Sequence, residues 1–480
     1  MKPANFLFIL SDQHSRDALG CYGHPVVQTP NLDRLAQRGT RFDSASTNCP
    51  ICVPERASLA TGRYVHQIRY WDNAYPYNGR VPSWHHRLRE QGFQIDSIGK
   101  LHFSGPGNDH GFTDEIEPLH VVEGVGDILG CIRDDAPIRK KRSGITDAGP
   151  GESTYLQYDR RNADHACQWL DSHRGDERPW ALFLSFVCPH PPYISPVAYY
   201  QRYAAADLPF PPQWRQADWP RHAAVDYFRT FFDFDPQFSE EEIRNMMAAY
   251  LGACTYLDAQ IGRVLDQLDA LGLTDETRVI YSSDHGEHRG ARGIYGKFTM
   301  YEESAGIPFI AAGPGVPAGN VVGTPVSLVD IFPTAVEAVG ATLTDEDADL
   351  PGSSIWTMAS EPDRDRTVFG EYHAVGSRRG IYMLRDRRHK YVHYVDDSPQ
   401  LFDLEEDPDE LCDLSDGNTG LIDAFESQLR RLLDPDEVDA LARRDQAAMI
   451  KSFGGREAVL GRGSFDNSPV PGESPAFRKH

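Results

Sequence analysis

Near-continuous runs of apolar residues predict the strands at the centre of the fold. Residues 6–10 contain no polar side chain, residues 180–187 are interrupted by a single serine, and residues 278–283 form a further short strand pattern. Runs without alternating polar positions are typical of strands that are buried on both faces of a sheet. Between them, residues 240–272 place apolar side chains on one helical stripe, and residues 29–39 have Pro in the first turn and Gly at the end of a predicted helix.

Strands that alternate with helices predict an α/β fold, with a mainly parallel sheet covered by helices on both faces. Ligands bind such sheets beyond the carboxyl ends of the strands. Polar residues follow three of the predicted strands directly: Asp12 and Gln13, then His190, then Asp284 and His285. This coincidence indicates a functional site at that edge of the sheet.

The pattern changes towards the C-terminus, where shorter strands follow one another. Residues 380–386 and 389–395 read as a hairpin, residues 400–404 as a third strand, and residues 421–433 as a helix. We therefore expect a large α/β domain over residues 1–365 and a smaller α+β subdomain with an antiparallel sheet over residues 366–450. Residues 451–480 are rich in Gly, Pro and Ser and are predicted to be a tail that is loosely held or docked on a partner, such as a second copy in a homo-oligomer.

The charge balance narrows the choice of partners. The chain of 480 residues carries 71 Asp and Glu against 48 Lys and Arg, a formal net charge of −23. This argues against nucleic acid or an anionic membrane as a partner, and an anionic substrate would require a locally basic site. The apolar run near the N-terminus is too short for a signal peptide, no segment resembles a membrane span, and the eight cysteines are scattered. We expect a cytoplasmic protein with reduced thiols.

The most informative motif is Cys52-Val53-Pro54-Glu55-Arg56, which is followed by the run 61–63, Thr-Gly-Arg. A helix that begins at Cys52 would present its positive N-terminal end to any negative charge there. Cys49 and Cys52 could instead be half of a zinc site or a redox pair, but none of the other six cysteines forms a second close pair.

Cys-x-Pro-x-Arg with the following Thr-Gly-Arg resembles the signature of the type I sulfatases of the alkaline phosphatase superfamily. The resemblance implies that a maturation enzyme oxidises Cys52 to formylglycine, whose hydrated aldehyde is the nucleophile. It also implies that Asp12, Gln13, Asp284 and His285 bind one divalent cation together with the modified Cys52. Oxygen ligands favour Ca²⁺, and the imidazole leaves Mn²⁺ or Zn²⁺ open.

Further blocks of the same family supply the rest of the predicted site. Lys100 and His102 stand in a Gly-Lys-x-His block, His190 in a Pro-His-x-Pro block, and Lys297 in a block that ends in Tyr-Glu. By resemblance, Arg56, Lys100 and Lys297 stabilise the sulfuryl oxygens, His190 protonates the departing alcohol, and His102 assists the release of sulfate.

Within the family, the choline sulfatases and the phosphonate monoester hydrolases look most similar. Trp71 and Asn73 lie in a block that resembles the choline sulfatases, and we expect both to contact substrate. Five nearby aromatic residues could form a cage for a cation, although packing is the alternative: Tyr70, Trp71, Tyr75, Tyr77 and Trp84.

Three functions follow from these observations. The first is hydrolysis of a small sulfate monoester, and the second is hydrolysis of a phosphonate monoester or phosphodiester on the same scaffold. Lys100 and His102 favour the sulfate ester, because the diester hydrolases tend to lack that pair. The third is a non-catalytic metal-binding protein in which Cys52 stays unmodified. Glu55 leaves this alternative open, because Ser, Thr or Ala is commoner at this position of the family motif.

Overall fold

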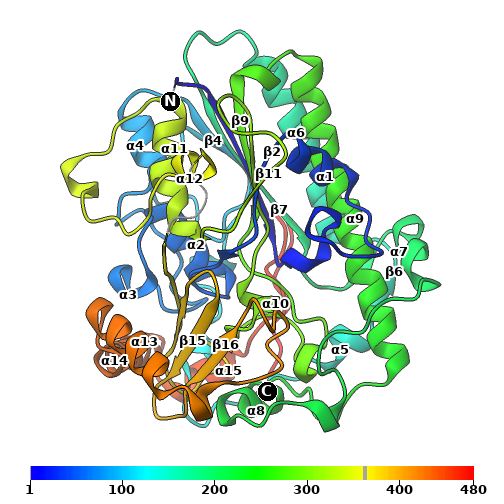
Figure 1. Cartoon of the computed structure of the whole chain (residues 1–480), viewed down its shortest axis with the longest axis vertical. Coiled ribbons are helices and arrows are strands. Elements are labelled where there is room, and N and C mark those ends of the chain that lie inside the picture. The colour runs from blue at the N-terminus through cyan, green and yellow to red at the C-terminus, as the bar shows by residue number, and fades with distance from the viewer. Residues whose placement is uncertain (1, 361–364, 480) are drawn as a thin grey trace.

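Eight strands form the central sheet of the computed structural model, which describes residues 2–360 and 365–479 (Figure 1). Their order across the sheet is β11-β2-β10-β9-β1-β7-β4-β5. The bounds in that order are Asn320–Val322, Gly39–Phe42, Phe309–Ala312, Thr277–Ser283, Asn5–Asp12, Ala181–Pro189, Ile95–Lys100 and Asp114–Leu119.

The centre of this sheet is parallel, as the sequence predicts. β1 pairs in parallel with β9 on one side and β7 on the other, and β4 continues the parallel order beyond β7. β10 is antiparallel to both of its neighbours. Phe6 to Leu10 are completely buried, which explains why this strand has no alternating polar positions.

Helices cover both faces of the sheet (Figure 1). On one face lie α1 (Pro30–Gln37), α6 (Thr154–Ser172) and α9 (Glu240–Ala270), which share an apolar cluster with Leu7 and Ile9 of β1. The other face is covered by the helices α2 (Cys52–Thr61), α4 (Trp84–Glu90), α11 (Ile331–Val339) and α12 (Ile355–Ser360). The predicted α/β class and the helices at 29–39 and 240–272 are confirmed.

A second sheet of four antiparallel strands lies beyond the carboxyl edge of the first (Figure 1). Its strands are β13 (Val368–Tyr372), β14 (Ile381–Arg385), β15 (His389–Tyr394) and β16 (Gln400–Asp403), followed by α13 (Thr419–Leu432). The predicted hairpin, third strand and helix are thus confirmed. The domain boundary at 365 stays a prediction, and residues 361–364 just before it lie outside the described residues.

The segment after residue 433 continues as helix, and α15 (Arg456–Arg462) lies within the predicted Gly/Pro-rich tail. α14 (Pro435–Ser452) and α15 follow α13, and the last segment returns along the molecule so that Ser464 pairs with Arg478. Pro at the start of α14 and the capping carboxylate of Asp434, which accepts from two backbone N–H groups, explain where that helix begins.

The remaining helices and strands are short connections. They are α3 (Val65–Ile68), α5 (Arg142–Thr146), α7 (Val197–Ala204), α8 (Ala223–Phe231), α10 (Glu302–Ala305), β3 (Ala45–Ser46), β6 (Gly149–Pro150), β8 (Ile194–Ser195) and β12 (Val326–Ser327). Across residues 2–360 and 365–479, no helix combines the length and the apolar character needed to cross a membrane.

Candidate active site

Three neighbouring strands end at the same place and deliver the predicted polar residues together. β1 ends at Asp12, β9 ends just before Asp284, and His190 follows β7. Gln13 turns the chain out of β1 with a φ of 68°, and its backbone N–H donates to Asp284 Oδ1 at 3.1 Å. The left-handed conformation is uncommon for Gln, so the hydrogen bond helps to hold a costly turn at the site.

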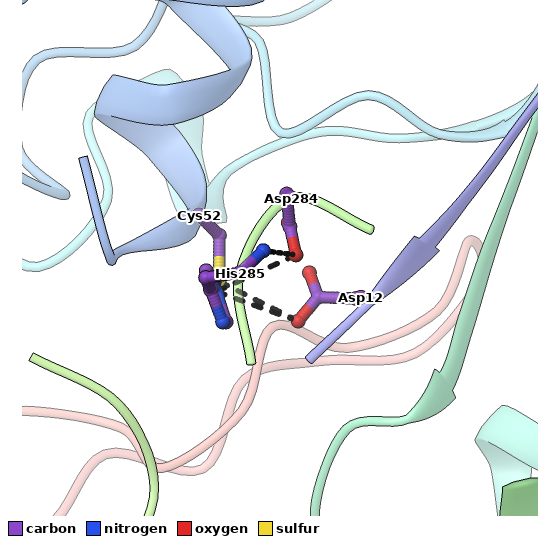
Figure 2. A group of neighbouring side chains, drawn as sticks. All are labelled: Asp12, Cys52, Asp284 and His285. Carbon is purple, nitrogen blue, oxygen red and sulfur yellow. Dashed lines mark hydrogen bonds and ion pairs between the residues drawn. The ribbon is translucent and has the colours of Figure 1, made fainter. Parts of the chain in front are cut away.

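Cys52 is the first residue of α2 and points into this cluster (Figure 2). Its Sγ lies 3.2 Å from His285 Nε2, 3.7 Å from Asp12 Oδ1 and 2.9 Å from Lys297 Nζ. Burial, followed by the negative charge of Asp12, raises the pKa of the Cys52 thiol to about 11. The thiol is therefore protonated at neutral pH and is a poor nucleophile in this form.

Two buried carboxylates converge beside this thiol. Burial and the charge of Asp12 raise the pKa of Asp284 to about 7. Burial would raise the pKa of Asp12 as well, but the positive charges of Lys100 and Lys297 outweigh it and hold this pKa well below its usual range. Ligand atoms of Asp12, Cys52, Asp284 and His285 all lie within 4.8 Å of one another. Like charges held this close are stabilised by a cation between them, so the donor set fits a divalent metal.

Arg56 and Lys100 contact the carboxylates rather than the open part of the site. Arg56 Nε donates to Asp284 Oδ2 at 2.9 Å, and its Nη2 lies 3.4 Å from Asp12 Oδ2. Arg56 Nη1 donates to the Lys100 carbonyl and to Ser185 Oγ. Lys100 Nζ lies 2.6 Å from Asp12 Oδ2, and both cationic side chains are almost completely buried. They therefore fix the two carboxylates in place.

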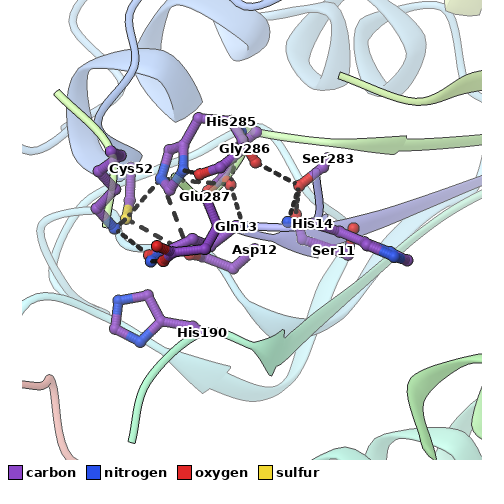
Figure 3. Close-up of polar contacts among 12 residues, drawn as sticks. Ser11, Asp12, Gln13, His14, Cys52, His190, Ser283, His285, Gly286 and Glu287 are labelled. Carbon is purple, nitrogen blue, oxygen red and sulfur yellow. Dashed lines mark hydrogen bonds and ion pairs between the residues drawn. The ribbon is translucent and has the colours of Figure 1, made fainter. Parts of the chain in front are cut away.

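Gln13 is oriented by contacts at both ends of its amide (Figure 3). Lys297 Nζ donates to Gln13 Oε1 at 2.9 Å, and Gln13 Nε2 donates to Glu287 Oε2. Glu287 in turn accepts from Tyr193 Oη and from the Gly296 N–H. The sequence analysis missed Glu287, although it stands only two residues after His285 in the same block.

The two predicted proton carriers are neutral in the substrate-free protein. Burial, then Lys297, lowers the pKa of His190 well below its usual range, and burial with Lys100 does the same for His102. His190 Nδ1 donates to the Pro191 carbonyl at 2.7 Å, which leaves its Nε2 as the proton acceptor. His190 stands apart from the hydrogen-bonded cluster (Figure 3). Neither ring nitrogen of His102 has a hydrogen-bond partner among the described residues.

Comparisons with known proteins agree with this geometry. The sulfatase family profile matches residues 4–341, and the C-terminal profile of N-sulphoglucosamine sulphohydrolase matches residues 286–435. The chain belongs to the sulfatase family. It is 31% identical to a choline-sulfatase of Rhizobium meliloti (strain 1021) over 92% of this chain and 89% of that protein. It is 30% identical to human arylsulfatase K over 86% of this chain and 79% of that protein.

The fold also matches that of a solved phosphonate monoester hydrolase from Agrobacterium radiobacter. The two share 24% identity with a TM-score of 0.71, over 99% of this chain and 100% of that chain. The protein is thus a sulfuric ester hydrolase with the mainly parallel α/β fold of its superfamily and a C-terminal antiparallel sheet.

A cavity of about 420 Å³ opens from the catalytic centre of this sulfatase, a size suited to a small-molecule substrate. Cys52, Gln13, His102, His190 and Lys297 lie at its inner end. Seven aromatic residues line it: Tyr155, Tyr193, Phe232, Phe234, Tyr295, Phe298 and Phe465.

The structure separates the two residues predicted to contact substrate. Asn73 lines the cavity, and its Oδ1 lies 3.4 Å from the Val53 N–H. Trp71 is fully buried outside the cavity, where its Nε1 donates to Asp445. The other four residues of the predicted aromatic cage also lie outside the cavity lining, and Tyr77 and Trp84 are fully buried. In this structure those side chains pack within the fold, the alternative that the sequence left open, and a cluster of aromatic residues in the sequence does not distinguish the two roles.

The C-terminal tail of the sulfatase forms part of the cavity wall. Residues 465–468 and Arg478 line the cavity. Asp466 lies 2.7 Å from Lys141 Nζ and 2.5 Å from Arg478 Nη1, and Tyr155 Oη donates to the Ser468 carbonyl at 2.5 Å. Gly and Pro content does not indicate where a segment docks, so the sequence could not place this wall.

Two residues near the motif have structural roles. The Glu55 carboxylate is buried and accepts from the Cys49 N–H at 2.6 Å, so it holds the segment that precedes α2. All eight cysteines are free, which leaves Cys49 and Cys52 without a disulfide between them. The unusual Glu55 is thereby explained without loss of the catalytic arrangement.

Proposed function

We propose that this sulfatase hydrolyses its ester through a formylglycine produced from Cys52 by a maturation enzyme. The observation that carries the proposal is the position of Cys52 at the buried start of α2, with Asp12, His285 and Lys297 around its Sγ. A formylglycine would supply a hydrated aldehyde with one hydroxyl to attack sulfur and a second whose deprotonation releases sulfate. The protonated, buried thiol offers neither.

We propose Asp12, Gln13, Asp284 and His285, with the modified residue 52, as the ligands of one divalent cation. Ca²⁺ suits the carboxylate and amide oxygens best, and Mn²⁺ or Zn²⁺ would be favoured by the imidazole. When bound, the cation would neutralise the two carboxylates and withdraw charge from the sulfuryl oxygens. Arg56 and Lys100 hold Asp12 and Asp284 in the ligating arrangement.

The remaining residues contact the substrate. Burial would lower the pKa of Lys297, but the negative charges of Asp12 and Asp284 raise it, so Lys297 Nζ is charged, and it lines the cavity beside Cys52, where the sulfuryl group would bind. Once the bound anion offsets the charge of Lys297, His190 Nε2 takes up a proton from water and then passes it to the leaving oxygen. The free ring of His102 takes the proton that must leave residue 52 before sulfate can depart.

The cavity lining supports a bulky alcohol with an aromatic or otherwise apolar face. The charged residues beyond the catalytic centre pair with one another, as in Arg139 with Asp127 and Lys141 with Asp466. A quaternary ammonium group would find aromatic rings there, but Asp127 and Asp466, which could attract it, are already paired with cationic side chains. We therefore expect an aryl sulfate to be a better substrate than a choline ester.

Steady-state kinetics with one common aryl leaving group tests the reaction class. We expect kcat/KM for the aryl sulfate to exceed that for the matched phosphonate monoester and phosphodiester, since a diester's second substituent would crowd Lys297 and His102. A clear preference for a phosphorus ester would instead favour the alternative suggested by the phosphonate monoester hydrolase. Absence of turnover with all three, in protein whose peptide digest contains unmodified Cys52, would favour a non-catalytic role.

We also propose that the protein acts in the cytoplasm, which the free state of all eight cysteines supports. Fractionation of cells that express the tagged protein, with a periplasmic marker as the control, tests this. Assembly through the tail stays a prediction, since the described part of the tail packs on its own chain.

A further inference from the structure

A second group of metal-ligating side chains lies at the edge of the central sheet, apart from the catalytic cluster. His110 lies in the loop between β4 and β5, Glu115 in β5, and His120 just after β5. His110 Nδ1 is 2.8 Å from Glu115 Oε1, and His120 Nε2 is 3.4 Å from Glu115 Oε2. One ligand atom from each residue lies within 4.8 Å of the other two.

The hydrogen bonding of the His120 imidazole is incomplete, which suggests a missing partner. Both ring nitrogens of His120 are shielded from solvent; Nε2 has only the 3.4 Å contact with Glu115, and Nδ1 has no hydrogen-bond partner among the described residues. A buried polar group left unpaired costs about 1–3 kcal/mol, so such groups normally have a partner. His110 Nε2 lies 3.4 Å from Ser104 Oγ, the kind of outer contact that orients a ligating histidine.

Glu115 is suited to hold a positive charge between the two rings. Its two carboxylate oxygens lie 2.8 Å from His110 Nδ1 and 3.4 Å from His120 Nε2, so an ion placed between the rings would also contact this carboxylate. About a fifth of its side chain is exposed, which leaves a path to solvent for an ion and for a water ligand.

We propose that His110, Glu115 and His120 bind a divalent transition-metal ion, with Zn²⁺ as the preferred ion. Two imidazoles and one carboxylate are a familiar ligand set for zinc, with bonds of about 2.0–2.2 Å. Such bonds require ligand atoms about 3.3 Å apart in a tetrahedral site. The observed group needs only small side-chain rotations to reach that spacing. A water molecule completes the four ligands.

The role of this ion is structural, because the site closes the segment that carries His102. The Leu119 carbonyl, next to His120, accepts from the Leu101 and His102 N–H groups at 3.1 and 2.8 Å. His102 itself has a left-handed φ of 57°. An ion that ties His110 to His120 therefore stabilises the loop from which His102 enters the active site.

The test separates this site from the catalytic one by using an Asp12→Asn/Asp284→Asn variant of the full chain. After removal of metals with a chelator, the protein is equilibrated with micromolar Zn²⁺ and its zinc content is measured by mass spectrometry. We expect one zinc per chain, a rise of several degrees in Tm, and a visible Co²⁺ absorption band typical of tetrahedral coordination. Adding His120→Ala should remove all three signals, whereas adding His165→Ala on α6 should leave them unchanged.

A second comparison keeps the proposal testable if the double variant does not fold. In the otherwise native chain, His120→Ala and the milder His120→Gln should each bind one zinc fewer than the parent protein. Equal zinc content in parent and both His120 variants would overturn the proposal. So would a folded double variant that binds no zinc, which would leave the three side chains as a hydrogen-bonded group without metal.

Discussion

At the scale of single residues, the active site holds the Cys52 thiol in a fixed position but in an unreactive, protonated form. Cys52 is surrounded by charged groups, yet burial and Asp12 keep its sulfur protonated. The helix N-terminus suggested a stabilised negative charge, but at this position burial is the larger effect. The motif alone could predict the position of Cys52, whereas its protonation depends on side chains from β1, β9 and the loop that carries Lys297.

Cys52→Ala should reduce kcat for an aryl sulfate by at least about a thousandfold, because removal of a nucleophile eliminates the covalent route. Cys49→Ala is the matched control. Cys49 is as buried as Cys52, but its hydrogen bond to Glu55 comes from the backbone N–H, which the substitution keeps. It should retain most of the activity. Comparable losses in both variants would favour a paired-cysteine site, and circular dichroism should show both to be folded.

Glu287→Gln should weaken binding of the divalent cation at the catalytic centre by about 10–100-fold, as expected for a residue that orients a ligand. A glutamine has one accepting oxygen instead of two and no charge, so its hold on Gln13 Nε2 weakens and Gln13 Oε1 is less firmly oriented. Calorimetric titration of Ca²⁺ into chelator-treated protein measures the affinity. Tyr193→Phe removes only one donor to Glu287 and should have a much smaller effect. Unchanged affinity in Glu287→Gln would refute the orienting role.

At the scale of elements, the sequence predicts which segments form the central strands, but it does not predict the order and direction in which the edge strands pair. Residues 6–10 and 180–187 belong to central strands that are buried on both faces of the sheet. Their nearly unbroken apolar sequence therefore predicts their position in the fold. The antiparallel direction of β10 and the place of β2 beyond it depend on contacts between distant segments. Likewise, Ser185 accepts from Arg56 of α2, and Glu287 accepts from Gln13 and Tyr193, partners far away in the sequence that a single sequence does not reveal.

Glu371 of β13 joins the second sheet to α3 and provides a test of such a long-range contact. Its Oε1 lies 2.9 Å from both the His66 N–H nitrogen and His66 Nδ1, and its Oε2 lies 2.9 Å from His373 Nε2. Burial would raise its pKa, but His66 and His373 lower it from the ordinary 4.5 to about 2. That difference corresponds to roughly 3 kcal/mol of stability.

Glu371→Gln should therefore lower the free energy of unfolding at pH 7 by roughly 3 kcal/mol. Since the folded-state pKa is depressed, this stability is present above about pH 4.5 and is lost as the pH falls towards 2. By pH 4 the wild-type protein should lose about 1 kcal/mol of it, so the gap to the variant narrows. Urea unfolding at both pH values measures this. Glu457→Gln, at an exposed position of α15, should match the wild type, and a pH-independent gap would contradict the linkage.

At the scale of the whole molecule, the net charge of −23 would repel an anionic substrate, so the active site needs basic side chains close to where the substrate binds. Arg56, Lys100 and Lys297 gather around the catalytic carboxylates, while the outer cavity holds its charges in pairs. The tail completes this outer part, because Asp466 pairs with Lys141 from the loop before α5. Residues more than 300 positions apart thus share one wall, which no local pattern predicts.

Asp466→Asn should loosen that wall without disturbing the catalytic centre. Loss of the carboxylate removes the ion pairs with Lys141 and Arg478, so the tail no longer shapes the space for the alcohol. We expect KM for a bulky aryl sulfate to rise roughly tenfold, about 1.4 kcal/mol of binding, with kcat changed less than about twofold. Hydrogen exchange of residues 464–478 should increase in the same variant. Glu473→Gln removes the same charge from an exposed position of the tail and should change neither quantity. If Asp466→Asn lowered kcat and left KM and exchange unaltered, the tail would not be a wall for the substrate, and Asp466 would instead act on the catalytic centre through the charges of the cavity.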